Sequence, residues 1–302
     1  MSRRPYRRSR GAAVVMAMLV VALAVALVSG VFQRQSIVAR QIENDAAFAQ
    51  AQRLMDGAVD WVRVILREDA RTSNVDHGGE AWAVSLEQTR LDNDNAEPAW
   101  VAGGIEDVQA RFNLRNLSGP EGLVPIEVAV LGRLLALVGS QASLAPILAA
   151  RIDRALGQRD APPGYPKVSP ATLDEIDFDD PRQREALELL RPFVTLLPVP
   201  SPVNANTASA EVLAARYSNL SLADARRLVE SRGRAHFLDL QDMAGRLPGQ
   251  TLTGGVGQVV VATQYFQLRG AVEYRRTHLH SLVLLKREAN RVEVVWKREA
   301  SA

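Results

Sequence analysis

The stretch that decides the fold is residues 11–32, GAAVVMAMLVVALAVALVSGVF, which begins at Gly11 and contains no formal charge. Five arginines lie among residues 1–10, and no acidic residue does. The uncharged run from Ala12 to Gln33 is 22 residues long, and at about 1.5 Å per residue a helix of that length crosses a bilayer core of roughly 30 Å. Because arginines stay on the cytoplasmic side, the sequence predicts a single-pass anchor whose C-terminal body is carried across the membrane.

A cleaved signal peptide is the competing interpretation. Ala24 and Ala26 flank Val25 in the small-x-small pattern that signal peptidases cut. This interpretation accounts for the arginines and for part of the apolar run. It does not account for the length of the run or for the helical pattern that continues after it, so the retained anchor is favoured.

Composition excludes several classes of function. The 302 residues include 36 basic and 34 acidic side chains, and without the five N-terminal arginines 31 basic residues remain. The body therefore lacks the basic excess that is typical of nucleic-acid binding proteins. The chain has no cysteine, which excludes disulfides and thiolate chemistry.

Beyond the membrane span the helical pattern continues. Apolar residues recur on one face from Ile37 to Ile65, with charged residues on the other faces. No proline interrupts this stretch, and Gly57 is its only weak point. Turn-forming residues dominate residues 72–79. The pattern predicts one long helix that is apolar on one face and runs to about Arg67.

After this helix the pattern changes to short strands over residues 80–117. Trp82, Val84 and Leu86 alternate with polar neighbours, which is typical of a half-buried strand, and residues 92–95 form a tight loop. Helical patterns follow, and strand patterns close the chain. The predicted helices are 125–138, 143–157, 180–190, 208–217, 223–231 and 240–243, and the last predicted strands are 265–268, 279–285 and 292–296. This order predicts a helical insertion within a small sheet domain.

Capping and proline signals refine the helical part. Thr207 is placed to cap the helix at 208–217, and Ser221 precedes the next helix. Prolines mark rigid connections at residues 161–166 and 198–202.

Four segments, in this order and spacing, carry a resemblance that extends over essentially the whole chain. They are the Arg-Gly-Ala junction at residues 10–12, DHGGEAWA at 76–83, ARFNLRNL at 110–117 and VNANTASAEVL at 203–213. Together they resemble the minor pseudopilin K component of the bacterial type II secretion system. The resemblance implies an α+β pseudopilin fold, in which a long N-terminal transmembrane helix packs on a small antiparallel sheet with a large inserted helical SAM-like domain.

The resemblance also implies a division of the chain. The expected parts are a prepilin leader peptide at 1–11, the transmembrane part of the helix at 12–33, the periplasmic helix and sheet at 34–118 and 262–302, an inserted helical domain at 119–200 and a second helical unit of helix-hairpin-helix or SAM-like type at 201–261.

The function implied by the resemblance is assembly rather than catalysis. Prepilin peptidase is expected to cut after Gly11, and the new amino terminus at Ala12 is expected to be N-methylated. The K component sits at the tip of a periplasmic pseudopilus with minor pseudopilins I and J, helps to start its assembly, and supports export of folded proteins across the outer membrane. The expected location is the inner membrane, with the body in the periplasm.

Met16 stands at the fifth position after the expected cut, where most pilin-like subunits carry a glutamate. A carboxylate in lipid needs a positive partner, which is the amino terminus of the subunit already in the fibre. A subunit at the tip has no such partner, so an apolar residue favours a tip role. Without the resemblance, Met16 is simply one more apolar residue of a membrane helix.

No catalytic set is evident, and no metal site is assigned. His278 and His280 share one face of a predicted strand, but no third ligand accompanies them. Residues 92–97 and 174–180 are rich in carboxylates, yet neither has the spacing of an EF-hand loop. Members of the resembled family can bind calcium in an acid-rich segment; here the corresponding residues 153–167 contain only Asp153 and Asp160. No cofactor is therefore expected.

The unit at residues 204–247 offers an alternative function, a membrane-anchored helix-hairpin-helix module that binds DNA, as in competence proteins. Such modules approach phosphate through a glycine-containing hairpin, whereas the turn at residues 218–221 reads SNLS. Arg226 and Arg227 could contact phosphate, but a simpler interpretation is that they lie on a solvated face of a helix. A structural scaffold without nucleic-acid binding is therefore favoured.

Overall fold

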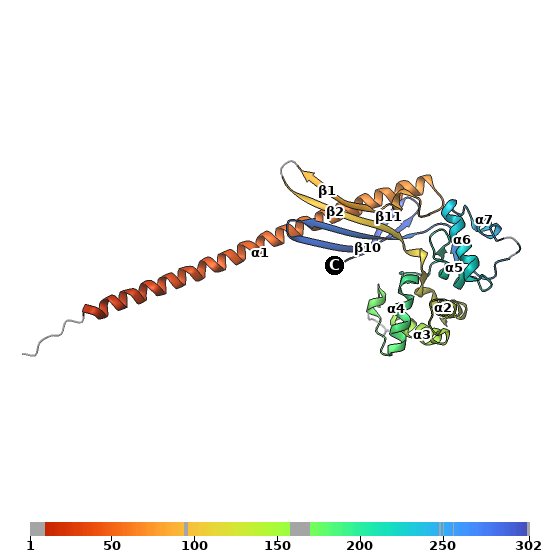
Figure 1. Cartoon of the computed structure of the whole chain (residues 1–302), viewed down its shortest axis with the longest axis horizontal. Helices are drawn as coiled ribbons and strands as arrows, with labels where there is room; N and C mark the ends of the chain where they lie inside the picture. Colours follow the sequence, from red (N-terminus) through yellow and green to blue (C-terminus); the bar gives the residue numbers. More distant parts are fainter. Residues whose placement is uncertain are drawn as a thin grey trace, which may run out of the picture.

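The computed structural model describes residues 10–93, 96–157, 170–247, 249, 251–255 and 257–300. A long helix extends from a body that consists of a five-stranded sheet and a group of short helices, and these helices lie at the end of the body far from the start of the long helix (Figure 1). The proline-rich connection predicted at residues 161–166 lies outside the described residues.

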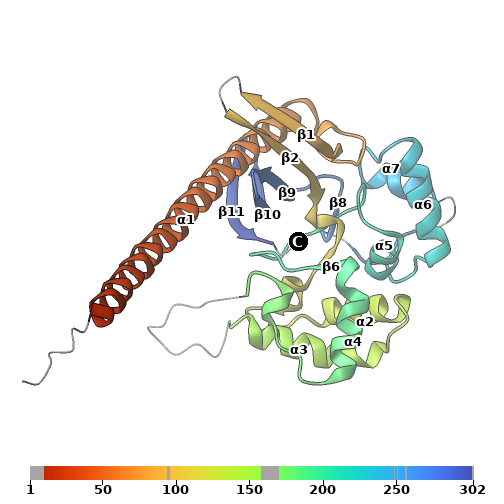
Figure 2. The same cartoon turned by 60° about the vertical axis from the view of Figure 1, so that its left-hand side comes forward.

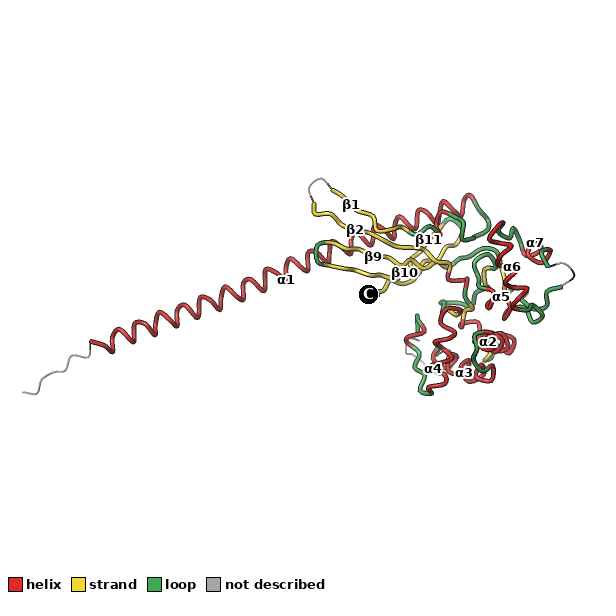
Figure 3. Tube along the Cα trace, in the orientation of Figure 1, coloured by secondary structure: helices red, strands yellow, loops and turns green. Residues whose placement is uncertain are grey.

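Helix α1, Arg10–Thr72, is continuous for 63 residues and ends five residues beyond the predicted end (Figure 3). In its first half the described side chains are almost all exposed, whereas its second half packs on the sheet. The side chains that it buries there follow the helical period: Ala51, Met55, Val59, Val62 and Leu66. The sheet and α1 therefore form one layer each of a two-layer body.

The sheet is antiparallel, with the order β1-β2-β9-β10-β11. Its strands are β1 (Leu86–Asn93), β2 (Ala96–Asp107), β9 (Tyr265–Tyr274), β10 (Thr277–Glu288) and β11 (Arg291–Glu299). The central pair, β2 and β9, is far apart in the sequence but aligned from Ala99 opposite Tyr274 to Asp107 opposite Phe266. The chain thus leaves the sheet at the end of β2 and returns beside the same point.

Two glycines allow close approaches, one between neighbouring strands and one between the sheet and α1. A Cβ at Gly103 of β2 would lie 2.6 Å from the carbonyl oxygen of Arg269 in β9, and a Cβ at Gly270 of β9 would lie 2.8 Å from the sulfur of Met55 in α1. Both distances are too short for real contacts, so β2 can lie this close to β9, and α1 this close to β9, only because these positions lack side chains.

All the helices after α1 lie between β2 and β9 in the sequence (Figure 2). They are α2 (Pro125–Leu137), α3 (Ala145–Ala155), α4 (Pro181–Leu190), α5 (Ala210–Arg216), α6 (Leu222–Arg234) and α7 (Leu240–Gly245). Single 3₁₀ turns are η1 (Ala81–Ala83), η2 (Val108–Ala110), η3 (Leu114–Leu117), η4 (Ala142–Leu144), η5 (Leu173–Glu175) and η6 (Arg191–Phe193). These helices form two groups along the chain, a first group of α2–α4 and a second group of α5–α7. One hydrophobic core, with residues from Phe112 to Val259, is shared by both groups.

Short strand pairs connect the helical part to the segments that enter and leave it. Strand β3 (Phe112–Asn113) pairs in parallel with β6 (Val194–Thr195), and β7 (Val203–Asn204) pairs in parallel with β8 (Val259–Val260). A two-residue pair, β4 (Ser118–Gly119) with β5 (Gly122–Leu123), precedes α2. The predicted α+β class is confirmed, as are the long helix on an antiparallel sheet and the helical insertion.

Two local predictions are wrong. Trp82 lies in η1 rather than in a strand. Its indole Nε1 donates to Glu80 Oε2 (2.8 Å), and its ring packs edge-on against Phe266. The predicted alternation is therefore absent, and Val84 is 73% exposed. Thr207 does not cap a helix. Ser209 is the N-cap of α5, and the Thr207 hydroxyl instead donates to a buried carboxylate.

Candidate functional site

The predicted processing and tip residues lie at the start of α1. The backbone of Gly11 and Ala12 is helical, and Met16 is 68% exposed. Within the described part of the chain, α1 is the one helix long and apolar enough to cross a membrane, and none of its most apolar window is buried by the protein. The apolar start of α1 is therefore a candidate membrane anchor.

Apolar residues remain exposed on α1 beyond the span. Ile37, Val38 and Ile42 lie on the free part of the helix, and Trp61 is 56% exposed where α1 covers the sheet. An exposed tryptophan amid a row of apolar side chains is typical of a surface that contacts another protein.

Trp61 borders an apolar groove between α1 and strand β2. The groove has a volume of about 360 Å³. Its apolar lining includes Trp61, Ile65, Trp82, Val84, Val101 and Ile105. The exposed face of α1 and this groove together are a candidate assembly surface.

A buried polar junction joins the sheet to the helical part, and Asp107 is its centre. The Asp107 carboxylate accepts hydrogen bonds from Asn204 Nδ2 (2.8 Å), the Thr207 hydroxyl (2.5 Å), the Thr263 hydroxyl (2.7 Å) and the backbone N–H of Gln109 (2.7 Å). Burial raises the pKa of Asp107, although all four donors oppose that shift. One carboxylate at the end of β2 thus holds three segments of the chain together.

Asn204 extends this junction to the loop that follows α1. Its Nδ2 also donates to the carbonyl of Asp76 (3.0 Å), and its Oδ1 accepts from the backbone N–H of Asn206 (2.9 Å). The carboxylate of Asp76 in turn accepts from the backbone N–H of Thr263 (2.7 Å).

Arg287 of β10 supplies the positive charge of the junction. Its guanidinium donates to Asp69 (2.7 Å) and to Asp76, and it lies over the ring of Phe266. Asp69, Asp76 and Glu80 place carboxylate oxygens within 4.8 Å of one another. Burial raises the pKa of Asp69 to about 6; Arg287 opposes this shift and the charge of Glu80 adds to it. Because Arg287 already occupies this acidic group, we interpret the group as a structural ion-pair cluster.

Three more asparagines, from the segments 110–117 and 203–213 that carried the resemblance, also connect distant parts of the chain. Asn113 donates to the carbonyl of Val199 (2.8 Å), and Asn116 exchanges two hydrogen bonds with the backbone of Ser201 (2.9 Å each). Asn206 likewise exchanges two with the backbone of Phe237 (2.7 and 2.9 Å). These side chains replace strand partners for backbone groups that would otherwise be buried unpaired.

The other predicted candidates are not brought together. His278 and His280 lie on β10, and among the described residues no metal-ligand group includes them. Most carboxylates at residues 174–180 bind protein partners: Asp174 pairs with Arg191, Glu175 with Arg298 and Asp179 with Arg151, and Asp180 caps α4. Residues 94–95 and 158–169, with Asp160, lie outside the described residues.

Sequence reasoning missed the polar junction. Asp76, Asn204 and Thr207 belong to the segments that carried the resemblance, but nothing in their spacing predicts that Asp107 and Thr263 meet them. A signal was present in the buried polar residue types themselves, since Asn and Asp between apolar residues are most often hydrogen-bonded in the core.

Comparisons with known proteins agree with this architecture. A family model described as type II secretion system (T2SS), protein K, matches residues 203–263, which include strand β7 and helices α5–α7. The type II secretion system protein K of Pseudomonas aeruginosa is 31% identical over 284 residues, which is 87% of this chain and 84% of that protein.

Among solved structures, a chain of the GspK-GspI-GspJ complex from the enterotoxigenic Escherichia coli type 2 secretion system has the same fold. It superposes with a TM-score of 0.68 at 19% identity, over 87% of this chain and all of that chain. This likeness concerns the fold alone, whereas the Pseudomonas relative matches in sequence over most of both chains. The chain belongs to the type II secretion system protein K family of minor pseudopilins.

Proposed function

We propose that this chain is the tip subunit of the secretion pseudopilus. Helix α1 anchors it in the inner membrane, the body lies in the periplasm, and the subunit starts assembly together with minor pseudopilins I and J. Through the pseudopilus it supports export of folded proteins across the outer membrane. No catalytic role is proposed.

The observation that supports the tip position is Met16. This apolar side chain stands two turns into the exposed start of α1, at the position where a fibre subunit needs a carboxylate to bind the amino terminus of its predecessor. A carboxylate without that partner would be costly in lipid. Met16 thus suits a subunit that has no predecessor.

The shape of the body also favours the tip. The helices α2–α7 lie at the end of the sheet away from the membrane span (Figure 1). In a tightly wound fibre, this bulk would collide with the next subunit, whereas at the end of the fibre it has free space.

The candidate assembly surface is where partner helices are expected to bind. Exposed apolar side chains of α1 and the groove beside Trp61 offer apolar contact sites along the helix. The structurally similar chain comes from a complex with GspI and GspJ, which makes the corresponding components the natural partners to test.

Processing of the amino terminus gives a direct test of the anchor. We propose that prepilin peptidase cuts after Gly11 and that Ala12 becomes N-methylated. Mass spectrometry of the mature chain is expected to find methyl-Ala12 as its first residue. A first residue near Leu27 would instead indicate a signal peptide and contradict the anchor.

The tip position predicts the effect of a charge at Met16. In the full chain, purified in detergent with I and J components, Met16→Glu is expected to lower the yield of the three-component complex, because the carboxylate has no amine to neutralise it. Met16→Leu is the matched control and should co-purify like the natural chain. Equal yields for Glu and Leu would remove the support that Met16 gives to the tip position.

The DNA-binding alternative has less support. Arg226 pairs with Glu211 (3.8 Å) and Arg227 pairs with Asp224, so both cations are already partnered. A salt-dependent DNA-binding measurement on the full chain distinguishes the two functions, and we expect no specific binding at physiological salt.

A further inference from the structure

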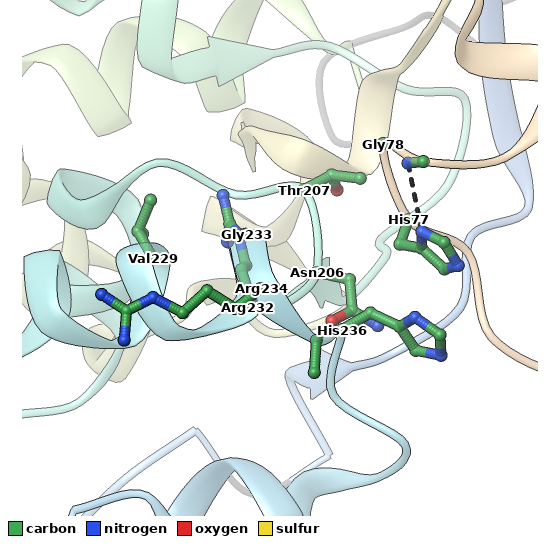
Figure 4. A pocket seen from close by; sticks show the side chains of 11 residues that line it. His77, Gly78, Asn206, Thr207, Val229, Arg232, Gly233, Arg234 and His236 are labelled. Atoms are coloured by element: carbon green, nitrogen blue, oxygen red, sulfur yellow. Dashed lines mark hydrogen bonds between the residues drawn. The ribbon is translucent and has the colours of Figure 1, made fainter.

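A hollow of about 610 Å³ lies where the loop after α1 meets the end of α6 (Figure 4). Three segments line it. They are His77–Gly79 from the loop, Asn206 and Thr207 from the segment before α5, and Val229 with residues 232–236 from α6 and the turn after it. The volume is within the usual range of small-molecule sites.

The ionisable side chains that line this hollow are all basic. Arg232 and Arg234 line it from α6, the imidazoles of His77 and His236 line it from two different segments, and no carboxylate is among its lining residues. The two imidazole rings stack at 3.9 Å with an angle of 11° between their planes. Two segments far apart in the sequence thus place polar ring nitrogens at one hollow.

Arg232 is the unusual member of this group. Burial lowers its pKa to about 10, and its guanidinium donates to the carbonyl of Ala205. In the part of the chain that the structure describes, neither Arg232 nor Arg234 makes an ion pair. Of the more deeply buried arginines, Arg216 and Arg287 pair with carboxylates, whereas Arg115 donates to a backbone carbonyl as Arg232 does. Arg232 differs from Arg115 because it lines an open hollow. A partly desolvated cation without a counter-ion is unfavourable, which indicates that an anion completes the site.

Two carboxylates lie near the histidines of the hollow: Glu80, whose Oε1 is 3.9 Å from Nε2 of His77, and Asp242, whose charge acts on His236. Glu80 accepts from the backbone N–H of His77 (2.9 Å) and from Trp82. Asp242 pairs with Arg246 (2.7 Å) and accepts from the backbone N–H of Leu238 (3.1 Å). Both carboxylates therefore have partners of their own.

Glycines keep the hollow open. A Cβ at Gly78 or at Gly233 would meet no atom within 4 Å, so a side chain could be accommodated at either position without a clash.

The hollow also lies at the end of the body opposite to the apolar start of α1 (Figure 1), which excludes the headgroups of the anchoring membrane as its ligand.

We propose that this hollow binds a small anion with carboxylate or phosphate oxygens, held by the guanidinium groups of Arg232 and Arg234 and bordered by the imidazoles of His77 and His236. Guanidinium groups suit such oxygens because they offer paired N–H donors. The anion would contact both the loop that follows α1 and the end of α6. Its binding would therefore stabilise the attachment of the second group of helices to the body, and this proposal does not depend on the tip position.

The test uses the full chain in a non-ionic detergent at constant ionic strength. Calorimetric titrations with inorganic phosphate and with citrate measure binding, and thermal unfolding is followed with each anion. Saturable binding with a raised unfolding temperature is expected for at least one of them. Binding of phosphate alone assigns a phosphate ligand, and binding of citrate alone assigns a carboxylate ligand.

Two variants locate the site. Arg234→Gln removes an exposed cation and is expected to weaken binding about tenfold, which is the effect of one lost charge-assisted hydrogen bond. Gly233→Leu is expected to abolish binding by filling the hollow. Arg226→Gln, on the same helix but outside the hollow, is the matched control and should bind like the natural chain. The proposal is overturned if neither anion binds saturably, or if either variant binds as tightly as the control; the arginines are then only cations at a helix end.

Discussion

Asn204 has no exposed surface, and yet it forms hydrogen bonds with two distant parts of the chain and with its own segment. At the scale of single residues, the segments that identify the family are explained by such contacts. Asn113, Asn116 and Asn206 bind backbone groups of distant segments in the same way. An amide offers both donors and an acceptor, so it can replace a strand partner on either side. The residues that make the sequence recognisable therefore build the joint between sheet and insertion.

This role predicts a large effect of Asn204→Ala. The substitution leaves the Asp107 carboxylate, the Asp76 carbonyl and the Asn206 N–H short of a partner in the core. The free energy of unfolding, measured by urea denaturation of the full chain in detergent, is expected to fall by about 3 kcal/mol. Asn290→Ala, at an exposed turn, is the control and should change it by less than about 0.5 kcal/mol. Equal effects of the two substitutions would contradict the role of Asn204.

A buried ion pair within the helical part gives a second prediction. Glu127 of α2 and Arg216 of α5 lie 2.7 Å apart, and both side chains are almost fully buried. Glu127→Ala leaves Arg216 as an unpaired buried cation and is expected to cost about 3–5 kcal/mol of stability. Glu188→Ala breaks an exposed pair with Arg191 and should leave the stability almost unchanged. If the double variant Glu127→Leu with Arg216→Met is no more stable than Glu127→Ala, the unpaired charge is not the cause.

At the scale of elements, the sequence predicted what local signals determine. The apolar period of α1 and Ser221, which precedes α6, placed helices correctly, because helix starts depend on neighbouring residues. The alternation at Trp82 was misleading because a contact with Phe266, distant in the sequence, decided the backbone there. The polar junction could not be predicted, since Asp107 and its partners Asn204 and Thr263 are 97 and 156 residues apart.

The hairpin between β10 and β11 offers a prediction at this scale. Its turn places Ala289 at a φ of 49°, a left-handed conformation that side chains with a Cβ disfavour. Ala289→Gly is therefore expected to stabilise the chain by about 1 kcal/mol, seen as a raised unfolding temperature. Ala271→Gly within β9 is the control and should lower that temperature, because glycine weakens a strand. A lowered temperature for Ala289→Gly would show that the turn is not strained.

At the scale of the whole molecule, α1, the loop after it and the last strands meet at the ion-pair cluster of Asp69, Asp76 and Arg287. This meeting point makes the stability of the body depend on pH. The pKa of Asp69 is about 6 in the folded chain, compared with an ordinary value of 3.8, so the folded chain binds this proton more tightly than the unfolded chain. The stabilisation from that proton is complete below pH 3.8 and is lost as the pH rises through about 6.

Asp69→Asn tests this dependence, because asparagine does not titrate. Unfolding temperatures of the natural chain and of the variant are measured between pH 4 and pH 8. The difference, natural chain minus variant, is expected to fall as the pH rises through about 6 and to be constant above pH 7. A difference that does not change with pH would contradict the raised pKa.

The attachment of the insertion has a mechanical consequence. The helical part is connected to the sheet by β2 and β9, and both connections leave the sheet at the same end, where Asp107 lies opposite Phe266. A pull on the helices away from the start of α1 would draw these two strands along their own length, past β1 and β10, rather than peel them from an edge. In that shearing geometry many ladder hydrogen bonds share the load and must break together. A subunit pushed or pulled at its far end would therefore transmit force through the sheet to α1 without coming apart.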